Sequence, residues 1–186
     1  MNTSHIPPAH YYNNETERLI FRPLTKEDVA SWIPFFKDKR GVEFVGGNSE
    51  YFRNLSDEER ATKWITKQIE RKENKVYGQL AVLEKATGKF LGLGGLISRI
   101  EKEEETYGEL EVTYSLLPEA RGNGYATELA VHFKNWALKN TDFPSVISLI
   151  HVENEASMNV ANKNGMKKEK EIVFFEMPIY VFRAER

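Results

Sequence analysis

The stretch PEARGNGYA, residues 118–126, separates a segment with strand periodicity from one with helix periodicity. Gly122 and Gly124 allow the backbone to adopt positive φ and to approach a ligand closely. A turn of this kind directs free backbone N–H groups outward at the start of the next helix, where the helix dipole also favours negative charge. The stretch therefore predicts a phosphate or pyrophosphate site, although a plain strand-to-helix turn has the same form.

The segments on either side of this turn have clear periodicities. Between Glu109 and Leu117 polar and apolar residues alternate, which predicts a half-buried strand over 109–117. Apolar residues from Ala126 to Ala137 recur at helical spacing and predict a helix over 124–139.

The rest of the chain predicts a mixed α/β domain. Further helices are expected from Thr25, over 56–73 with Ser56 or Asp57 as the cap, and over 155–164, ended by Gly165. Further strands are expected at 18–22, 79–83, 90–97, 146–152, 172–175 and 179–182, with Pro178 at the last junction. This order gives a largely antiparallel sheet of about seven strands, flanked by about four helices. Residues 46–48 form a glycine-rich break and 101–105 an acidic connection. Residues 1–15 are expected to be a flexible or draped extension, and 16–186 a single domain.

Composition sets the broad class of the protein. The 186 residues, 40% of them hydrophobic, are typical of one globular domain. Lys plus Arg total 26 against 28 Asp plus Glu, so no surface for nucleic acid or anionic membrane is indicated. The absence of Cys excludes disulfides, thiolate metal sites and a Cys acyl-enzyme. We see no signal peptide or membrane-spanning run and expect a cytoplasmic protein.

Two common nucleotide motifs do not fit the glycine turn, since the third glycine of G-x-G-x-x-G and the Gly-Lys-Ser/Thr of the P-loop are missing. Instead, Arg121-x-x-Gly124-x-Ala126 resembles the motif Q/R-x-x-G-x-G/A of the GNAT acetyltransferase superfamily. The segment 154–166 resembles the GNAT block N-x-x-A/S…K-x-G-F, with Met in place of Phe. TERLIFRPL, residues 16–24, is similar to the first strand of the Rim-type enzymes, which acetylate protein N-termini.

The resemblance implies acetyl-CoA as co-substrate and a GNAT fold in which strands 109–117 and 146–152 splay apart. Pantetheine would enter the gap and pair with the backbone of Ser115, Leu116 and Leu117, where one amide would hold the thioester carbonyl. The turn would hold the pyrophosphate through Arg121, Gly122, Asn123, Gly124, Tyr125 and Ala126.

Amine acylation requires a neutral nucleophile. An N-terminal α-amine, with an ordinary pKa of ~7.7–8.0, needs less help than a lysine near ~10.4. Glu111 corresponds to the Glu of the Rim-type E-I-G-Y segment and is the candidate base, although Thr113 stands where that subfamily prefers Gly. Glu109 on the same face is the alternative base, and a solvated strand-face carboxylate is the alternative interpretation of Glu111.

In many GNAT enzymes a Tyr on the short helix gives a proton to the leaving thiolate. Ala161 occupies that position here. The Rim-type pattern has a Ser three residues after the Asn, and this residue, Ser157, is the candidate donor or relay. The alternative is a Ser bonded to its own helix backbone. Asn154 is expected to cap the helix, to bind the pantetheine amides, or to do both.

The predicted function is direct transfer of acetyl from acetyl-CoA to a primary amine, with a protein or peptide N-terminal α-amine as the expected acceptor. A small-molecule amine acetyltransferase, for a polyamine, amino acid or aminoglycoside, and a non-catalytic CoA-binding protein are the alternatives. His151 is interpreted as a structural strand residue. His5, His10 and His132 are not spaced as metal ligands, so no metal is predicted. Residues 179–182 could pair or pack across the interface of a homodimer.

Overall fold

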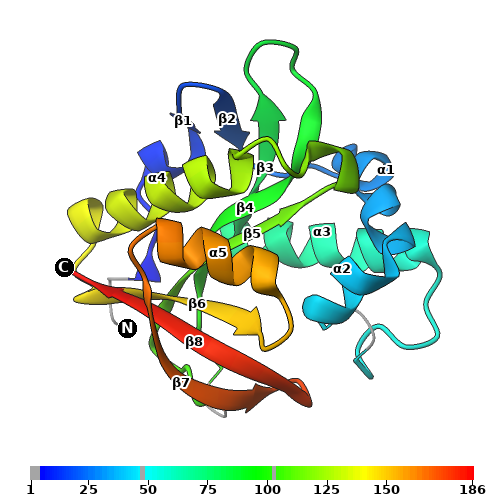
Figure 1. The fold of residues 1–186 in the computed structure, drawn as a ribbon. Coiled ribbons are helices and arrows are strands. Elements are labelled where there is room, and N and C mark those ends of the chain that lie inside the picture. The colour runs from blue at the N-terminus through cyan, green and yellow to red at the C-terminus, as the bar shows by residue number, and fades with distance from the viewer. Residues whose placement is uncertain (1–4, 47–48, 102–103) are drawn as a thin grey trace.

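The computed structural model describes residues 5–46, 49–101 and 104–186. Two residues of the glycine-rich break (47–48) and two of the acidic connection (102–103) lie outside the described residues. Among the described residues, eight strands form one sheet in the order β1-β2-β3-β4-β5-β6-β8-β7 (Figure 1). Every neighbouring pair is antiparallel except the parallel pair β5 and β6. The strands are β1 Asn14–Glu15, β2 Leu19–Arg22, β3 Gln79–Glu84, β4 Phe90–Ser98, β5 Leu110–Leu116, β6 Ser145–His151, β7 Lys167–Phe174 and β8 Met177–Glu185.

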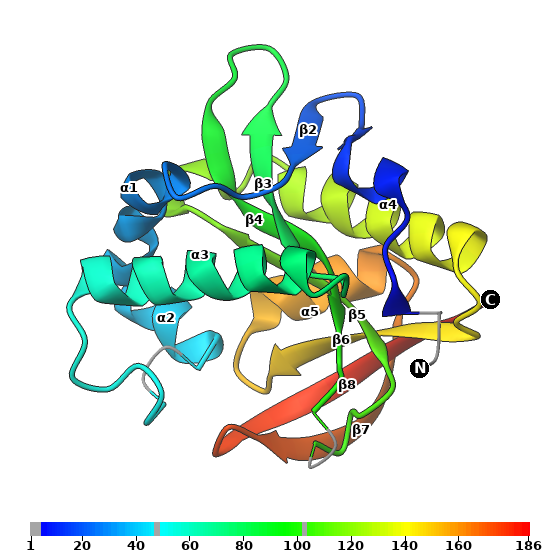
Figure 2. The same cartoon turned by 180° about the vertical axis from the view of Figure 1, so that it is seen from behind.

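Five α-helices, counted over the same residues, cover the two faces of this sheet. They are α1 Asp28–Trp32, α2 Lys39–Phe44, α3 Asp57–Glu73, α4 Tyr125–Asn140 and α5 Glu155–Lys163. Helices α4 and α5 lie on one face (Figure 1), while α3 and the shorter α1 and α2 lie on the other (Figure 2). The predicted α+β architecture is confirmed, with eight strands rather than about seven and five helices rather than about four.

The first helical region is divided where a single helix was expected. The carboxylate of Asp28 accepts a hydrogen bond from Thr25 N–H at 2.8 Å and pairs with Arg22 at 2.7 Å, which fixes the start of α1. Pro34 has no N–H to continue an α-helical ladder, and Ile33–Lys37 tighten into a 3₁₀ helix. Helix α2 begins only after this break.

The start of α3 is confirmed at the predicted residue. Ser56 Oγ accepts a hydrogen bond from Glu59 N–H at 3.3 Å, and the Glu59 carboxylate accepts one from Ser56 N–H at 2.7 Å. This complete capping box satisfies backbone donors that the first helical turn cannot use.

Two apolar clusters attach the helices to the sheet. On the α4 face, the buried rings of Phe133 and Trp136 pack against the sheet. On the α3 face, Trp32 and Phe36 pack in one cluster with Ile65 of α3. At about 25 cal/mol per Å² of buried apolar area, such rings supply the main driving force for assembling the layers.

Residues 5–15, the part of the expected extension that the structure describes, belong to the folded sheet and core. Strand β1 begins at Asn14, inside the expected N-terminal extension. Tyr11 is fully buried, its hydroxyl donates to Gly78 O at 2.8 Å, and the same hydroxyl accepts a hydrogen bond from Leu96 N–H at 2.8 Å. The described part of the extension therefore lies draped on the core and is fixed there by a buried side chain.

The expectation of a half-buried β5 was wrong. Glu111 and Ser115, on the face predicted to be solvated, are only 5% and 8% exposed. The reason is that helices cover both faces of the sheet, which an alternating strand sequence alone does not reveal.

The C-terminal hairpin is longer than predicted. β7 and β8 are joined by Phe175 and Glu176, while Pro178 lies inside β8 and faces Val173 of β7. Residues 179–182 pair with β6 on one side and β7 on the other. Their backbone is thus already paired within the sheet, so these residues have no free strand edge through which a second copy could pair.

β5 and β6 diverge along their length. A single residue pair, Glu111 with Ile147, is in register between them in the described sheet, and Ser148 Oγ donates to Val112 O at 2.7 Å just beyond it. Further along, the two strands separate, as the expected splay requires. In the part of the chain that the structure describes, no helix combines the length and apolar character needed to cross a membrane.

Candidate active site

The glycine turn between β5 and α4 has the conformation that its sequence predicts. Gly122 and Gly124 both have φ of 79°, in the left-handed region that favours glycine. Gly124 is the N-cap of α4, and Glu128 N–H donates to its carbonyl at 3.1 Å. The backbone N–H groups of residues 125–127 therefore have no helical acceptor and point out of the helix end.

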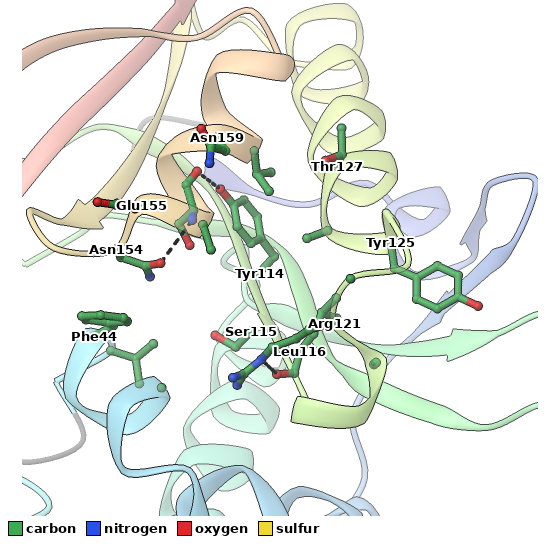
Figure 3. Close-up of a pocket in the computed structure, with 18 of the residues that line it drawn as sticks. Phe44, Tyr114, Ser115, Leu116, Arg121, Tyr125, Thr127, Asn154, Glu155 and Asn159 are labelled. Carbon is green, nitrogen blue, oxygen red and sulfur yellow. Dashed lines mark hydrogen bonds between the residues drawn. The ribbon is translucent and has the colours of Figure 1, made fainter.

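These amides border a cleft of about 740 Å³ that runs from the glycine turn past α5 (Figure 3). Its other walls come from α2 and from Tyr114, Ser115 and Leu116 of β5. Free amides at a helix N-terminus suit a pyrophosphate, and the volume lies in the range of small-molecule sites. Acetyl-CoA therefore fits the donor groups that the cleft presents.

One side of β5 faces this cleft without a partner strand. Leu117 N–H donates to Leu91 O at 2.9 Å, so Leu117 pairs toward β4 and lies outside the cleft, contrary to expectation. Main-chain groups alternate in direction along a strand, so the N–H of Leu116 points the opposite way, into the gap. Of the three residues predicted to meet pantetheine, the structure brings Ser115 and Leu116 to the cleft.

Arg121 and Asn123 shape the turn with their side chains. Arg121 Nε donates to Leu116 O at 3.0 Å, and Nη1 pairs with Asp38 just before α2. The Asn123 side-chain amide donates to Arg121 O at 3.1 Å, and Asn123 does not line the cleft. The predicted phosphate turn is thus braced by these two side chains, and the first-turn amides of α4 are the groups it presents.

Several cleft residues were not selected from the sequence. Arg40 of α2, Thr127 of α4 and Lys163 of α5 line the cleft, and the two cations add to the positive end of α4. Lys163 belongs to the matched segment 154–166, whereas Arg40 lies in a stretch without any motif. Tyr125 lines the cleft through its backbone, since its ring points away (Figure 3) and its hydroxyl donates to Glu84 at 2.6 Å.

The start of α5 places two predicted residues beside the cleft. Asn154 Oδ1 accepts a hydrogen bond from Ser157 N–H at 3.1 Å, which confirms Asn154 as the helix cap. Ser157 lines the cleft, whereas Ala161, one turn later, is 1% exposed in the core and lines no cavity. A tyrosine at position 161 would therefore meet packed side chains.

Tyr114 is a site residue that the alternating pattern of β5 places on the apolar face of the strand. Its hydroxyl donates to Ser157 O at 3.1 Å, which joins β5 to the first turn of α5 (Figure 3). Burial raises the pKa of the Tyr114 hydroxyl, so this group stays protonated and acts as a donor near neutral pH.

A second cavity, of about 450 Å³, lies against the α3 face of the sheet. Glu111 borders it and pairs through Oε2 with Arg99, so it is an ion-paired carboxylate and not a solvated one. Glu109, the alternative base, pairs with Arg183 at 2.8 Å and lines neither cavity. Of the two candidate bases, Glu111 lies at a cavity and Glu109 does not.

The carboxylates that line this second cavity are paired with arginine side chains. Its other two carboxylates, Glu101 and Glu104, lie 3.5 Å from Arg71 and 3.8 Å from Arg99. Lys67 adds a further cation to the wall, and burial lowers its pKa. Across the described residues the cavity thus presents no carboxylate without a guanidinium partner.

His151 is part of the wall of the same cavity. Its Nδ1 accepts a hydrogen bond from Glu153 N–H at 3.2 Å, and its ring lies 5.2 Å from that of Phe44. An imidazole that accepts at Nδ1 carries its proton on Nε2, so the free nitrogen can donate but not accept. This geometry agrees with the structural role expected for His151.

The cleft and the second cavity share a boundary. The residues that line both are Phe44, Val45, Tyr114, Ser115, Asn154 and Ser157. A group presented at the inner end of the cleft can therefore be reached by a nucleophile held in the second cavity. The arrangement suits transfer of a group between two bound molecules without a free intermediate.

The model of the acetyltransferase (GNAT) domain family matches residues 18–167. The chain therefore belongs to the GNAT acetyltransferase family. It is an acetyl-CoA-dependent N-acetyltransferase, which accounts for a cleft with free helix amides beside a second, separate cavity.

Individual proteins are also similar to this chain. YkkB of Bacillus subtilis (strain 168) is 32% identical over 172 residues, which cover 91% of this chain and 94% of YkkB. The structure of an acetyltransferase from Agrobacterium tumefaciens str. C58 superimposes with a TM-score of 0.74 at 24% identity and covers 94% of each chain. A spermidine N-acetyltransferase from Vibrio cholerae, solved with CoA and spermine, gives a TM-score of 0.68 at 15% identity, covering 91% of this chain and 96% of that one.

Proposed function

We propose that this enzyme transfers the acetyl group to the N-terminal α-amine of a peptide or protein, as Rim-type enzymes do, by direct attack while both substrates are bound. The observation that carries the proposal is the shared boundary of the two cavities at Tyr114, Ser115, Asn154 and Ser157. The chain has no Cys, so the acetyl group cannot rest on a side-chain thiol between two half-reactions.

In this proposal the second cavity holds the acceptor, and it is called the acceptor cavity below. Its carboxylates are all paired with cations, which favours an acceptor with one amine. A polyamine or aminoglycoside gains affinity from unpaired carboxylates, and here Glu101, Glu104 and Glu111 are each paired with a guanidinium. Lys67 adds a repulsive charge for a polycation. The similarity to a spermidine acetyltransferase is one of fold and carries no information about the acceptor.

Exposed apolar side chains at the acceptor cavity favour a macromolecular acceptor. Tyr51 and Phe175 line the cavity and are 46% and 53% exposed. Ile100, which is 41% exposed, lies between two lining residues in the chain. Grouped apolar side chains on a surface are typical of sites that contact another chain.

In the proposed mechanism, acetyl-CoA supplies the acetyl group and the thiolate that leaves. The amides of residues 125–127 hold the pyrophosphate, and the N–H of Leu116 is the donor suited to the thioester oxygen. Glu111 takes the proton of the amine, directly or through water, at Oε1, because Oε2 is held by Arg99. An α-amine, with an ordinary pKa of ~7.7–8.0, is partly neutral near neutral pH and needs no strong base.

Ser157 is proposed as the hydroxyl that donates a hydrogen bond to the departing sulfur or relays a proton from water to it. Its backbone is fixed at both polar atoms, since Asn154 Oδ1 accepts from its N–H and Tyr114 donates to its carbonyl. A side chain on so well fixed a backbone is preorganised for one position in the cleft.

The test is transfer from acetyl-CoA to a panel of peptides with free and blocked N-termini, followed by thiol release. Mass spectrometry of the products should place the acetyl group on the α-amine, and N-terminally blocked peptides that contain lysine should not react. Faster transfer to spermidine or an aminoglycoside than to every peptide would contradict the proposal.

A further inference from the structure

The turn between β7 and β8 carries a residue that its backbone disfavours. Phe175 and Glu176 have φ of 48° and 62°. Two-residue hairpin turns with positive φ at both positions favour Asn-Gly or Asp-Gly, because a side chain beyond Cβ is crowded there. A bulky aromatic residue in this conformation is a rare outlier that marks local strain.

Burial does not compensate for this strain. Phe175 is 53% exposed, and its main aromatic contact is an edge-to-face one with Phe174, with ring centroids 4.5 Å apart. Both rings line the acceptor cavity. The turn thus holds a large apolar side chain in a conformation that suits Asn, at the border of the cavity, without packing it into the core.

Another part of the cavity wall is also aromatic. Tyr51, Phe52 and Trp64 line it, and the rings of Phe52 and Trp64 are stacked with centroids 5.6 Å apart. Lys63 lies over the Tyr51 ring at 3.5 Å, which helps to fix that ring at the border. These rings come from the segment before α3 and from α3 itself, whereas Phe175 comes from the far end of the chain.

We propose that Phe174 and Phe175 of the β7–β8 turn, together with Tyr51, Phe52 and Trp64, form a subsite for a large apolar or aromatic side chain near the amine of the acceptor. The inference rests on the proposed function, and it adds the chemical class of the acceptor. Aromatic walls select apolar surface by burial and ring contacts, and the paired charges of the cavity leave no group that would reward a second amine on the acceptor.

The decisive variant is Phe175→Asn, because a structural role and a binding role predict opposite results. Asn adopts positive φ more readily than Phe, so the melting temperature of the variant should equal or exceed that of the unaltered protein. Val173→Thr is the matched control, since Val173 is 77% exposed on the same hairpin and does not line the cavity.

Binding is measured by calorimetry on protein saturated with CoA, which cannot transfer an acetyl group. Two peptides that differ only in their first residue, Phe or Ser, serve as probes. The Phe peptide should bind about 10-fold more tightly, the effect of burying one aromatic side chain. Phe175→Asn should reduce this preference to about threefold or less without weakening the Ser peptide, and Val173→Thr should retain it.

Equal affinity for the two peptides, or an unchanged preference in Phe175→Asn, would overturn the subsite. Acetylation assays with the same peptides separate this result from failure of the proposed function. Transfer to both peptides with equal kcat/KM removes the subsite and leaves α-amine acetylation intact, whereas transfer to neither peptide removes both proposals.

Discussion

Arg121 of the glycine turn pairs with Asp38 at the start of α2, and α2 ends at Phe44, which lines both cavities. One ion pair therefore links the turn that faces the cofactor to the helix that borders the acceptor. We expect Arg121→Ala and Asp38→Ala each to raise the acceptor KM by up to about fivefold, in keeping with a pair that is partly exposed. In a double-mutant cycle the double variant should have an acceptor KM no higher than that of the more impaired single variant. Additive effects on KM would show that the two residues act independently.

The glycine turn can be tested by adding charge and bulk at the helix end. Gly124→Glu should reduce CoA affinity by at least about 100-fold, because a carboxylate beside the first-turn amides opposes a phosphate. The change also forces a side chain into positive φ, at about 1–2 kcal/mol.

Gly88→Glu is the matched control for this strain. Gly88 has φ of 72°, and an added Cβ would meet no atom within 4 Å. The two variants should lose similar thermal stability, and only Gly124→Glu should lose CoA binding in calorimetry. Retention of affinity in Gly124→Glu would remove the turn from the cofactor site.

The role of Glu111 can be separated from its ion pair. Glu111→Gln should lower kcat by about 100-fold and flatten the acidic limb of the kcat/KM pH profile, with the CoA dissociation constant within about twofold. Glu109→Gln breaks a similar ion pair, with Arg183, and Glu109 lies two residues earlier in the chain and outside both cavities. A loss of rate of equal size in both variants would point to strand stability instead of proton transfer.

Ser157→Ala tests the proton donor. We expect the chemical step to slow by about 100-fold, while the melting temperature stays almost constant because Asn154 still caps α5 through the Ser157 N–H. Tyr114→Phe removes only the bond to the Ser157 carbonyl and should cost less in rate. Rapid-quench single-turnover kinetics give the comparison, and a Ser157→Ala rate within about twofold of the original would withdraw Ser157 from catalysis.

The stability of the fold should depend on pH through His132. Burial lowers the pKa of His132 below its ordinary value of 6.5, and the ring is stacked on Phe21. The unfolded chain therefore takes up a proton on His132 before the folded chain does, so stability is complete above about pH 6.5 and falls as the pH drops toward the lowered folded value. His132→Phe should reduce the loss of melting temperature between pH 7.5 and 5.5, and an unchanged slope would refute the assignment. Burial also lowers the pKa of His5, so His5 still contributes to the pH dependence of stability in that variant.

Local patterns in the sequence predicted the elements and the glycine turn, because helix caps, periodicity and positive-φ glycines act over a few residues. They placed α3, α4, α5 and their caps within a residue or two. Burial of Glu111 and Tyr11 could not be predicted in this way, since it depends on which distant helices or loops cover a face. The same holds for the site: Tyr114 and Arg40 reach the cleft only through the tertiary arrangement.

The position of the gap between β5 and β6 also bears on how the sheet avoids pairing with strands of other proteins. Strands with unsatisfied main-chain groups attract foreign strands and promote aggregation, which is why they are usually a hazard at the outside of a sheet. Here β7, one of the two edge strands, begins with five exposed charged residues, Lys167–Glu171. The unsatisfied backbone is kept at the centre of the sheet, in a cleft bordered by α2, α4 and α5. A slender extended ligand can enter there, whereas another folded protein cannot bring a strand alongside it.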